Sequence, residues 1–253
     1  MFDLSQPWQT SRFASFDLET TGTEAGVDRI IEIGIVVFDD GEVVDRYQQL
    51  VDPEMELPPI ITEVTGIKPE DLVGQPKLAE VIDEAMQRLT AQPILAYNHE
   101  FDTKMLRGEL KRLGRDDELP PCLDPFPFCW EHLREKGLTK NAQLGTVSAF
   151  MEIPLDAAHR ADHDAEAAGR VMLKLPEYVL LPDPLDQLLQ LQGALMQKVN
   201  ERFARFRRNK PNAGGVLSGD DVRIELGAAY IYGDETDPIR ALFSRIPDVR
   251  DLR

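Results

Sequence analysis

The sequence predicts a layered α/β domain, because strand-like segments come first and then alternate with helical ones. Three segments have the apolar, β-branched character of strands: 11–18, 29–38 and 42–51. Turn residues at 39–41 join the last two of these into an antiparallel hairpin. After them come a helix at 77–89, a strand at 93–97, and helices at 101–113, 143–150 and 164–173. The domain is expected to end near residue 180.

Composition favours a globular protein that stays inside the cell. Of 253 residues, 42% are hydrophobic and 29% are charged, which is ordinary for a folded domain. The longest uncharged apolar run covers only 33–38, far short of the roughly 20 residues that cross a bilayer. The two cysteines, Cys122 and Cys129, provide no disulfide framework. We therefore expect a cytoplasmic protein with no secretory leader and no membrane partner.

Charge divides the chain into two parts. The net charge is −17, which excludes an ordinary basic nucleic-acid binder. Residues 183–253 carry 11 acidic and 11 basic side chains, so the whole imbalance lies in residues 1–182. Prolines at 176, 182 and 184 mark the boundary. We expect a domain at 1–182 and an extension at 183–253, made of an amphipathic helix (185–206), a Gly/Pro linker (210–221) and a short β segment (222–232).

Asp17 and Glu19 form the first of three acidic clusters. If both lie on one strand, their spacing of two puts both carboxylates on the same face. Two such charges about 4 Å apart repel by about 4 kcal/mol at an effective dielectric near 20, unless a cation lies between them. A solvated strand edge would carry the same pattern without any function.

The other two clusters each place an acid at the start of a helix. Asp102 and Asp164 fall in predicted first turns, where the helix dipole favours an anion. His159 is five residues before Asp164, so the two can converge only if His159 lies on the preceding loop. His163 is the nearer histidine, and we expect it to be an exposed residue of the helix start.

Taken in order, the motifs FDLETTG, YNHEFD and HRADHD resemble those of the DEDDh (DnaQ-like) 3′→5′ exonucleases, a family that includes the proofreading subunit of the bacterial replicative polymerase. The resemblance covers about residues 12–175 and implies a ribonuclease H-like mixed sheet flanked by helices. It implies two divalent cations, Mg²⁺ or Mn²⁺, held by four ligands: Asp17, Glu19, Asp102 and Asp164. His159 would be the general base. Arg160 stands where the sister group carries a tyrosine base, so the histidine branch fits.

The resemblance also implies where the terminal nucleotide binds. Residues just after the first Glu line that site in the family, and their counterparts here are Thr20, Thr21 and Gly22. The segment 61–67 resembles a stretch that packs near the same nucleotide, which makes Thr65 a candidate contact. Asn98, in the second motif, is another. For 61–67, a loop joining sheet to helix is an alternative interpretation.

The implied activity is release of nucleoside 5′-monophosphates from single-stranded or frayed DNA 3′ ends, in replication proofreading or repair. Two alternatives remain: the same chemistry on RNA 3′ ends, and a non-catalytic module that docks on a polymerase. The helix at 185–206 ends in basic residues, so it could pack on the domain, form a homodimer, contact nucleic acid or dock on a polymerase. Because the acidic core offers few cations to phosphates, we expect the metals and the 3′ end to supply most of the affinity.

Overall fold

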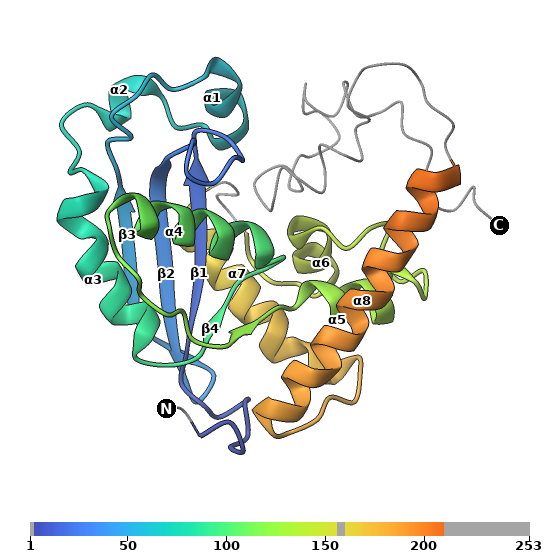
Figure 1. The fold of residues 1–253 in the computed structure, drawn as a ribbon. Coiled ribbons are helices and arrows are strands. Elements are labelled where there is room, and N and C mark those ends of the chain that lie inside the picture. The colour runs from blue at the N-terminus through green and yellow to red at the C-terminus, as the bar shows by residue number, and fades with distance from the viewer. Residues whose placement is uncertain (1–2, 156–159, 210–253) are drawn as a thin grey trace.

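A mixed sheet forms the centre of the described part of the protein (Figure 1). The computed structural model describes residues 3–155 and 160–209, so His159, the linker at 210–221 and the segment at 222–232 lie outside the described residues. In the described chain the strands are β1 (Phe13–Thr20), β2 (Ile30–Asp39), β3 (Glu42–Leu50), β4 (Ile94–Leu95) and β5 (Cys122–Leu123). Their order is β3-β2-β1-β4-β5, with β1, β2 and β3 antiparallel and β4 and β5 parallel to β1. The predicted fold class is confirmed.

Helices cover both faces of the sheet (Figure 1). The helical elements are α1 (Pro59–Thr65), α2 (Pro69–Leu72), α3 (Leu78–Thr90), α4 (Glu100–Arg112), α5 (Phe126–Cys129), the π-helical turn η1 (Trp130–Arg134), α6 (Leu144–Phe150), α7 (Ala161–Lys174), the 3₁₀ turn η2 (Leu175–Glu177) and α8 (Leu185–Asn209). Helices α3 and α4 pack on one face, and α7 packs on the other. None of the helices in the described ranges has the length and apolar character needed to span a membrane.

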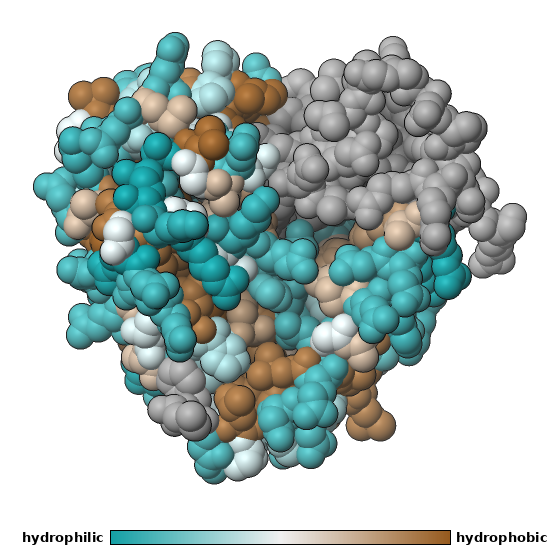
Figure 2. Space-filling model, in the orientation of Figure 1, coloured by the Kyte–Doolittle hydropathy of each residue, from teal (hydrophilic) through white to brown (hydrophobic). Residues whose placement is uncertain are grey.

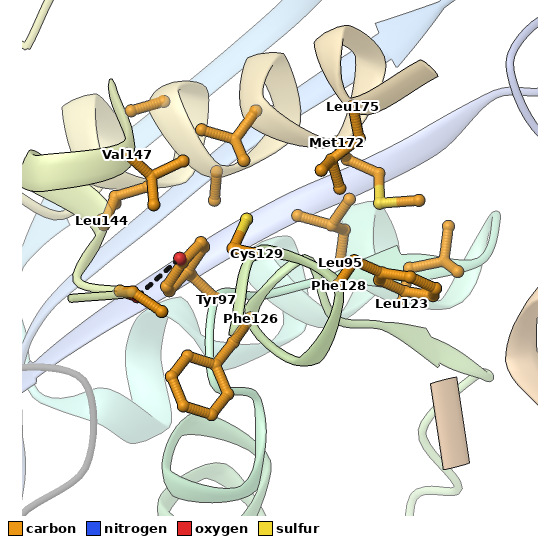
Figure 3. Packing of buried hydrophobic residues seen from close by; sticks show 14 of the residues in the cluster. Leu95, Tyr97, Leu123, Phe126, Phe128, Cys129, Leu144, Val147, Met172 and Leu175 are labelled. Carbon is orange, nitrogen blue, oxygen red and sulfur yellow. Dashed lines mark hydrogen bonds between the residues drawn. The ribbon is translucent and has the colours of Figure 1, made fainter. Parts of the chain in front are cut away.

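Alternation along β1 separates two hydrophobic clusters. Ala14, Phe16 and Leu18 face α3 and α4, whereas Phe13 faces the α7 side. Figure 3 shows the second cluster, to which Met172 of α7 and Cys129 of α5 both contribute. There the Tyr97 hydroxyl donates to the Ala142 carbonyl at 2.7 Å, which satisfies a buried polar group. The odd-numbered residues of β1 that follow Phe13 therefore point toward α7.

Helix α8 shares this second cluster. Four of its apolar side chains are buried there: Leu185, Leu188, Leu195 and Val199. The chain just before α8 is tied to the N-terminal segment, since the Trp8 indole donates to the Pro182 carbonyl at 3.0 Å. The amphipathic helix expected at 185–206 is present, and it packs on the domain. The division at residue 182 stays a prediction.

The basic end of α8 is partly engaged by acids of the neighbouring elements. Lys198 lies 3.5 Å from Glu131, and Arg202 pairs with Glu135. Cations that are already paired offer less to a phosphate backbone than free ones. These contacts favour the packing interpretation of the helix over a nucleic-acid grip.

Candidate active site

Three buried carboxylates from β1 and α7 gather at one point. Asp17 and Glu19, on the α7 side of β1, each place an oxygen within 4.8 Å of the other and of an oxygen of Asp164. Each of these residues is less than a tenth exposed. The expectation that Asp17 and Glu19 share a face is thus confirmed, and so is the placement of Asp164 in the first turn of its helix.

Asp102 approaches this group from α4. It lies in the first turn of that helix, as expected, and its side chain is fully buried. One oxygen, Oδ1, accepts the Leu18 backbone N–H at 3.1 Å, whereas Oδ2 is buried without a hydrogen-bond partner. Asp102 stands outside the 4.8 Å group, yet its charge acts on both Asp17 and Glu19.

Electrostatics make this cluster costly without a counter-charge. Burial, and then the charges of the other acids, raise the pKa of Asp17 and that of Glu19 well above their usual values. At 4.8 Å, each pair of charges would repel by about 3–4 kcal/mol at an effective dielectric near 20. Glu19 Oε2, like Asp102 Oδ2, is buried and unpartnered. Hard carboxylate oxygens aimed at a shared point fit a divalent cation such as Mg²⁺ or Mn²⁺.

Glu32 on β2 fixes the start of α7. It is fully buried, and its carboxylate accepts the Ala161 backbone N–H at 3.2 Å and the Arg160 Nε–H at 3.1 Å. The first bond satisfies one of the free N–H groups that every helix N-terminus leaves. Asp164, one turn further on, is thereby held opposite β1.

The segment that carries these acids matches a known protein family. Residues 15–172 match the family model described as Exonuclease (RNase_T). The chain belongs to the exonuclease family. The matched region begins in β1 and ends in α7, so it includes all four acids.

Individual exonuclease relatives match over part of their own length. The PolC-type DNA polymerase III of Halalkalibacterium halodurans is 33% identical over 209 residues, covering 81% of this chain and 14% of that protein. The 3′-5′ exonuclease DinG of Staphylococcus epidermidis is 32% identical over 165 residues, covering 64% of this chain and 18% of that protein. This chain therefore spans less than a fifth of these two relatives.

Solved exonuclease structures share the fold. E. coli exonuclease I, in a zinc-bound complex with single-stranded DNA, has a TM-score of 0.58 and 22% identity, covering 66% of this chain and 40% of that one. Exonuclease X with 5′-overhanging duplex DNA has a TM-score of 0.55 and 17% identity, covering 71% of this chain and 99% of that one. At these identities the likeness concerns architecture.

A glycine on β2 lets the start of α7 approach the central sheet close to the acids. Gly34 of β2 pairs with Asp17 across the sheet. A Cβ at this position would lie 2.1 Å from the Ala161 carbonyl carbon and 2.2 Å from the Asp162 nitrogen. These are backbone atoms, so they cannot move aside without moving the helix. The start of α7, with Asp164, is thus set by the absence of a side chain at Gly34.

Gly34→Ala is therefore expected to displace α7 and to destabilise the protein by about 1–3 kcal/mol through overpacking. The displacement should lower the rate of the proposed exonuclease activity about 10-fold or more. Gly145→Ala is the matched control. Gly145 lies in α6, and a Cβ added there would have no neighbouring atom within 4 Å. The control should keep full activity and melt at the same or a higher temperature, since Ala is the better helix former. Equal rates for the two variants and the wild type would contradict the role of Gly34.

Thr20, Thr21 and Gly22 lie at the end of β1 and in the turn after it. The Thr20 hydroxyl donates to the Gly22 carbonyl at 2.6 Å, and the Thr21 hydroxyl oxygen accepts the Arg29 N–H at 3.0 Å. Both threonines are almost fully buried, so their hydroxyls shape the turn next to Glu19. Any contact of this turn with a nucleotide stays a prediction.

Thr65 and Asn98 occupy different surroundings. The Thr65 hydroxyl is buried, donates to the Ile61 carbonyl at 2.9 Å and accepts the Ile67 N–H at 3.1 Å, so its bonds are local to α1. Asn98 is half-buried and has φ of 60°, in the turn between β4 and α4. Asn98 therefore lies in the turn that leads into α4, the helix of Asp102. The Thr65 hydroxyl, in contrast, bonds to backbone groups near the end of α1.

Of the two histidines in the third motif, only His163 lies within the described residues. His163 is exposed in the first turn of α7, with Nε2 3.9 Å from Asp162. This confirms the expectation that it is a surface residue of the helix start. His159 lies outside the described residues, and its role stays a prediction.

Sequence reasoning missed two buried acids beside the site, Glu32 and Asp124. Glu32 carried a visible signal, because it is a lone charge in the strand-like run 30–33 and only a partner could make its burial tolerable. Asp124 follows a strand of two residues, which is too short to show any periodicity. It is fully buried, and its carboxylate accepts three backbone N–H groups.

Proposed function

We propose that this chain is a 3′→5′ exonuclease that releases nucleoside 5′-monophosphates from DNA 3′ ends. The observation that carries the proposal is the buried convergence of Asp17, Glu19 and Asp164, with Asp102 beside them, in a chain of the exonuclease family. The names of its relatives support the polarity and the substrate, because they include a 3′-5′ exonuclease and PolC-type DNA polymerases III. A role in proofreading or repair is part of the same proposal.

The four acids are proposed to hold two divalent cations, Mg²⁺ or Mn²⁺. Cations held there would supply an activated water and would stabilise charge on the attacking and leaving oxygens. The chain contributes the geometry. Asp17 and Glu19 stand on a central strand, and Asp102 and Asp164 stand on first helical turns. The Leu18 N–H binds the Asp102 carboxylate, and the N–H of Ala161 at the start of α7 binds Glu32.

His159 is proposed to accept the proton of the attacking water, because an imidazole with a pKa near 6.5 titrates close to neutral pH. His159→Ala is expected to lower the rate about 100-fold or more. It should also remove the rise in rate with increasing pH on the acidic side of the pH–rate profile. His163→Ala is the matched control, since that side chain is exposed on the helix start, and it should keep both rate and profile. If instead His163→Ala carried the loss, the assignment of the base would be wrong.

Single-stranded DNA is the substrate form that we propose. Solved relatives of the fold include exonuclease I with a dT13 oligonucleotide. Polymerase docking and homodimer formation, two of the alternatives for the extension, remain proposals. The engagement of Lys198 and Arg202 by acids of this chain weighs against α8 as a DNA-binding element.

The test uses full-length protein, Mn²⁺ or Mg²⁺, and 5′-labelled single-stranded DNA and RNA of one sequence. The expected result is a ladder of DNA products that shorten progressively from the 3′ end. Immediate release of the labelled terminal nucleotide would reverse the polarity. Degradation of RNA with DNA intact would favour the RNA-trimming alternative, and no degradation of either would favour a non-catalytic module.

A further inference from the structure

Helix α8 makes a specific polar contact with the end of β5, an edge strand of the sheet. Gln192 is buried, and its Oε1 accepts the Asp124 backbone N–H at 2.8 Å. Its Nε2 donates to the Cys122 carbonyl at 3.1 Å. One side chain from α8 thus pairs with two backbone groups at the end of β5, as a neighbouring strand would.

The carboxylate of Asp124 carries this support to the start of α4. Oδ1 accepts the N–H groups of Asn98 and Phe126, each at 2.9 Å, and Oδ2 accepts that of His99 at 3.2 Å. Asn98 has φ of 60°, a conformation that costs energy in a residue other than glycine and persists only where its surroundings hold it. The Asp124 carboxylate provides such a hold.

Asp102 follows this turn directly. The His99 carbonyl accepts the Thr103 N–H at 3.0 Å, so the residue whose N–H binds Asp124 also forms the first turn of α4, which carries Asp102. An open groove of about 600 Å³ lies between the start of α4 and α8, and Gln192 lines it together with His99, Met196 and Asn200 (Figure 2). Support from α8 therefore reaches the start of α4 through Gln192 and Asp124.

We propose that Gln192 and Asp124 are positioning residues that set the placement of Asp102, and thereby the affinity of the site for divalent cations. This inference rests on the proposed function, which makes Asp102 a metal ligand. It assigns a part of the chain beyond residue 182 to the active site. Residues that orient metal ligands through hydrogen bonds change affinity or activity by about 10- to 100-fold when replaced.

The test compares Gln192→Leu with Gln197→Leu in the full-length protein. Both replace an amide by an apolar group of similar size on α8, but Gln197 is exposed and bonds to Glu201 of its own helix. We expect Gln192→Leu to weaken Mn²⁺ binding about 10-fold in calorimetry without nucleic acid, and to lower kcat about 10-fold with KM for the oligonucleotide changed less than about twofold. Gln197→Leu should match the wild type in all three quantities.

Asp124→Asn provides a second, nearly isosteric variant that decides the matter alone should Gln192→Leu fail to fold. It turns an NH₂ group toward one of the three N–H donors and should weaken Mn²⁺ binding in the same direction. Unchanged Mn²⁺ affinity and kcat in the folded variants, with only a lower melting temperature, would overturn the positioning role. A wild type that binds Mn²⁺ but degrades no oligonucleotide would refute the proposed function and leave the Mn²⁺ comparison valid. A wild type that does not bind Mn²⁺ would overturn both.

Discussion

Replacing Asp17 by Asn is expected to abolish nucleotide release and, at the same time, to make the metal-free protein more stable. The loss of rate should be about 1000-fold or more, which corresponds to about 4 kcal/mol of transition-state stabilisation. The gain in stability follows from burial and from the neighbouring acids, which raise the pKa of Asp17 in the folded state. Above the unfolded pKa, near 3.9, such a group lowers stability, and the penalty is relieved as the pH falls toward that value. Asn carries no charge and removes the penalty.

Thermal melting with EDTA and with Mn²⁺ measures both effects. In EDTA at neutral pH, the variant should melt about 2–4 °C higher for each kcal/mol regained. Mn²⁺ should raise the melting temperature of the wild type, because a ligand that binds only the folded state stabilises it, and should leave that of Asp17→Asn almost unchanged. Asp162→Asn is a matched control, since Asp162 lies in the first turn of α7 but pairs with Arg46. A variant that melts lower in EDTA and keeps the Mn²⁺ response would contradict the metal-site assignment.

Truncation after Pro182 is expected to unfold the protein. It removes the four buried side chains of α8, each contributing about 1.5–3 kcal/mol by burial, and the sum is comparable with the whole stability of a typical domain. It also uncovers Trp130, whose ring lies 5.0 Å from that of Phe203. Circular dichroism should show no cooperative transition for 1–182.

The control for this truncation ends after Asn209 and keeps all of α8. It should melt cooperatively, because the buried contacts of α8 remain. A cooperative transition of 1–182 at the wild-type temperature would show that α8 is dispensable for folding. The charge-based division of the chain at residue 182 would then also mark a stability boundary.

Prediction from sequence succeeded where periodicity is long and failed where contacts are distant. The three long strands and helices α3, α4 and α8 were predicted because each shows its pattern over eight or more residues. Strand β5 and helix α5 were missed, since two and four residues show no period. Helix α7 begins at Ala161, three residues before the predicted start, because Glu32, 129 positions away, binds its first N–H.

The candidate site was accessible from sequence for a different reason. Two acids on one strand and two on first helical turns depend on local spacing, and the structure agrees with that spacing. The contacts that hold these acids in place, in contrast, join residues far apart in the sequence. Gln192 lies 68 positions from Asp124, and the register that places Gly34 under α7 follows from the packing of the whole sheet.

The bond from the Leu18 N–H to Asp102 places a constraint on any redesign of the site. Leu18 sits between Asp17 and Glu19, so the amide that anchors the helix-borne acid belongs to the peptide that separates the strand-borne pair. A shift of α4 would therefore displace β1, and a change in the register of β1 would displace Asp102. An engineer who wished to accommodate a larger ion would need to rebuild strand and helix as one unit.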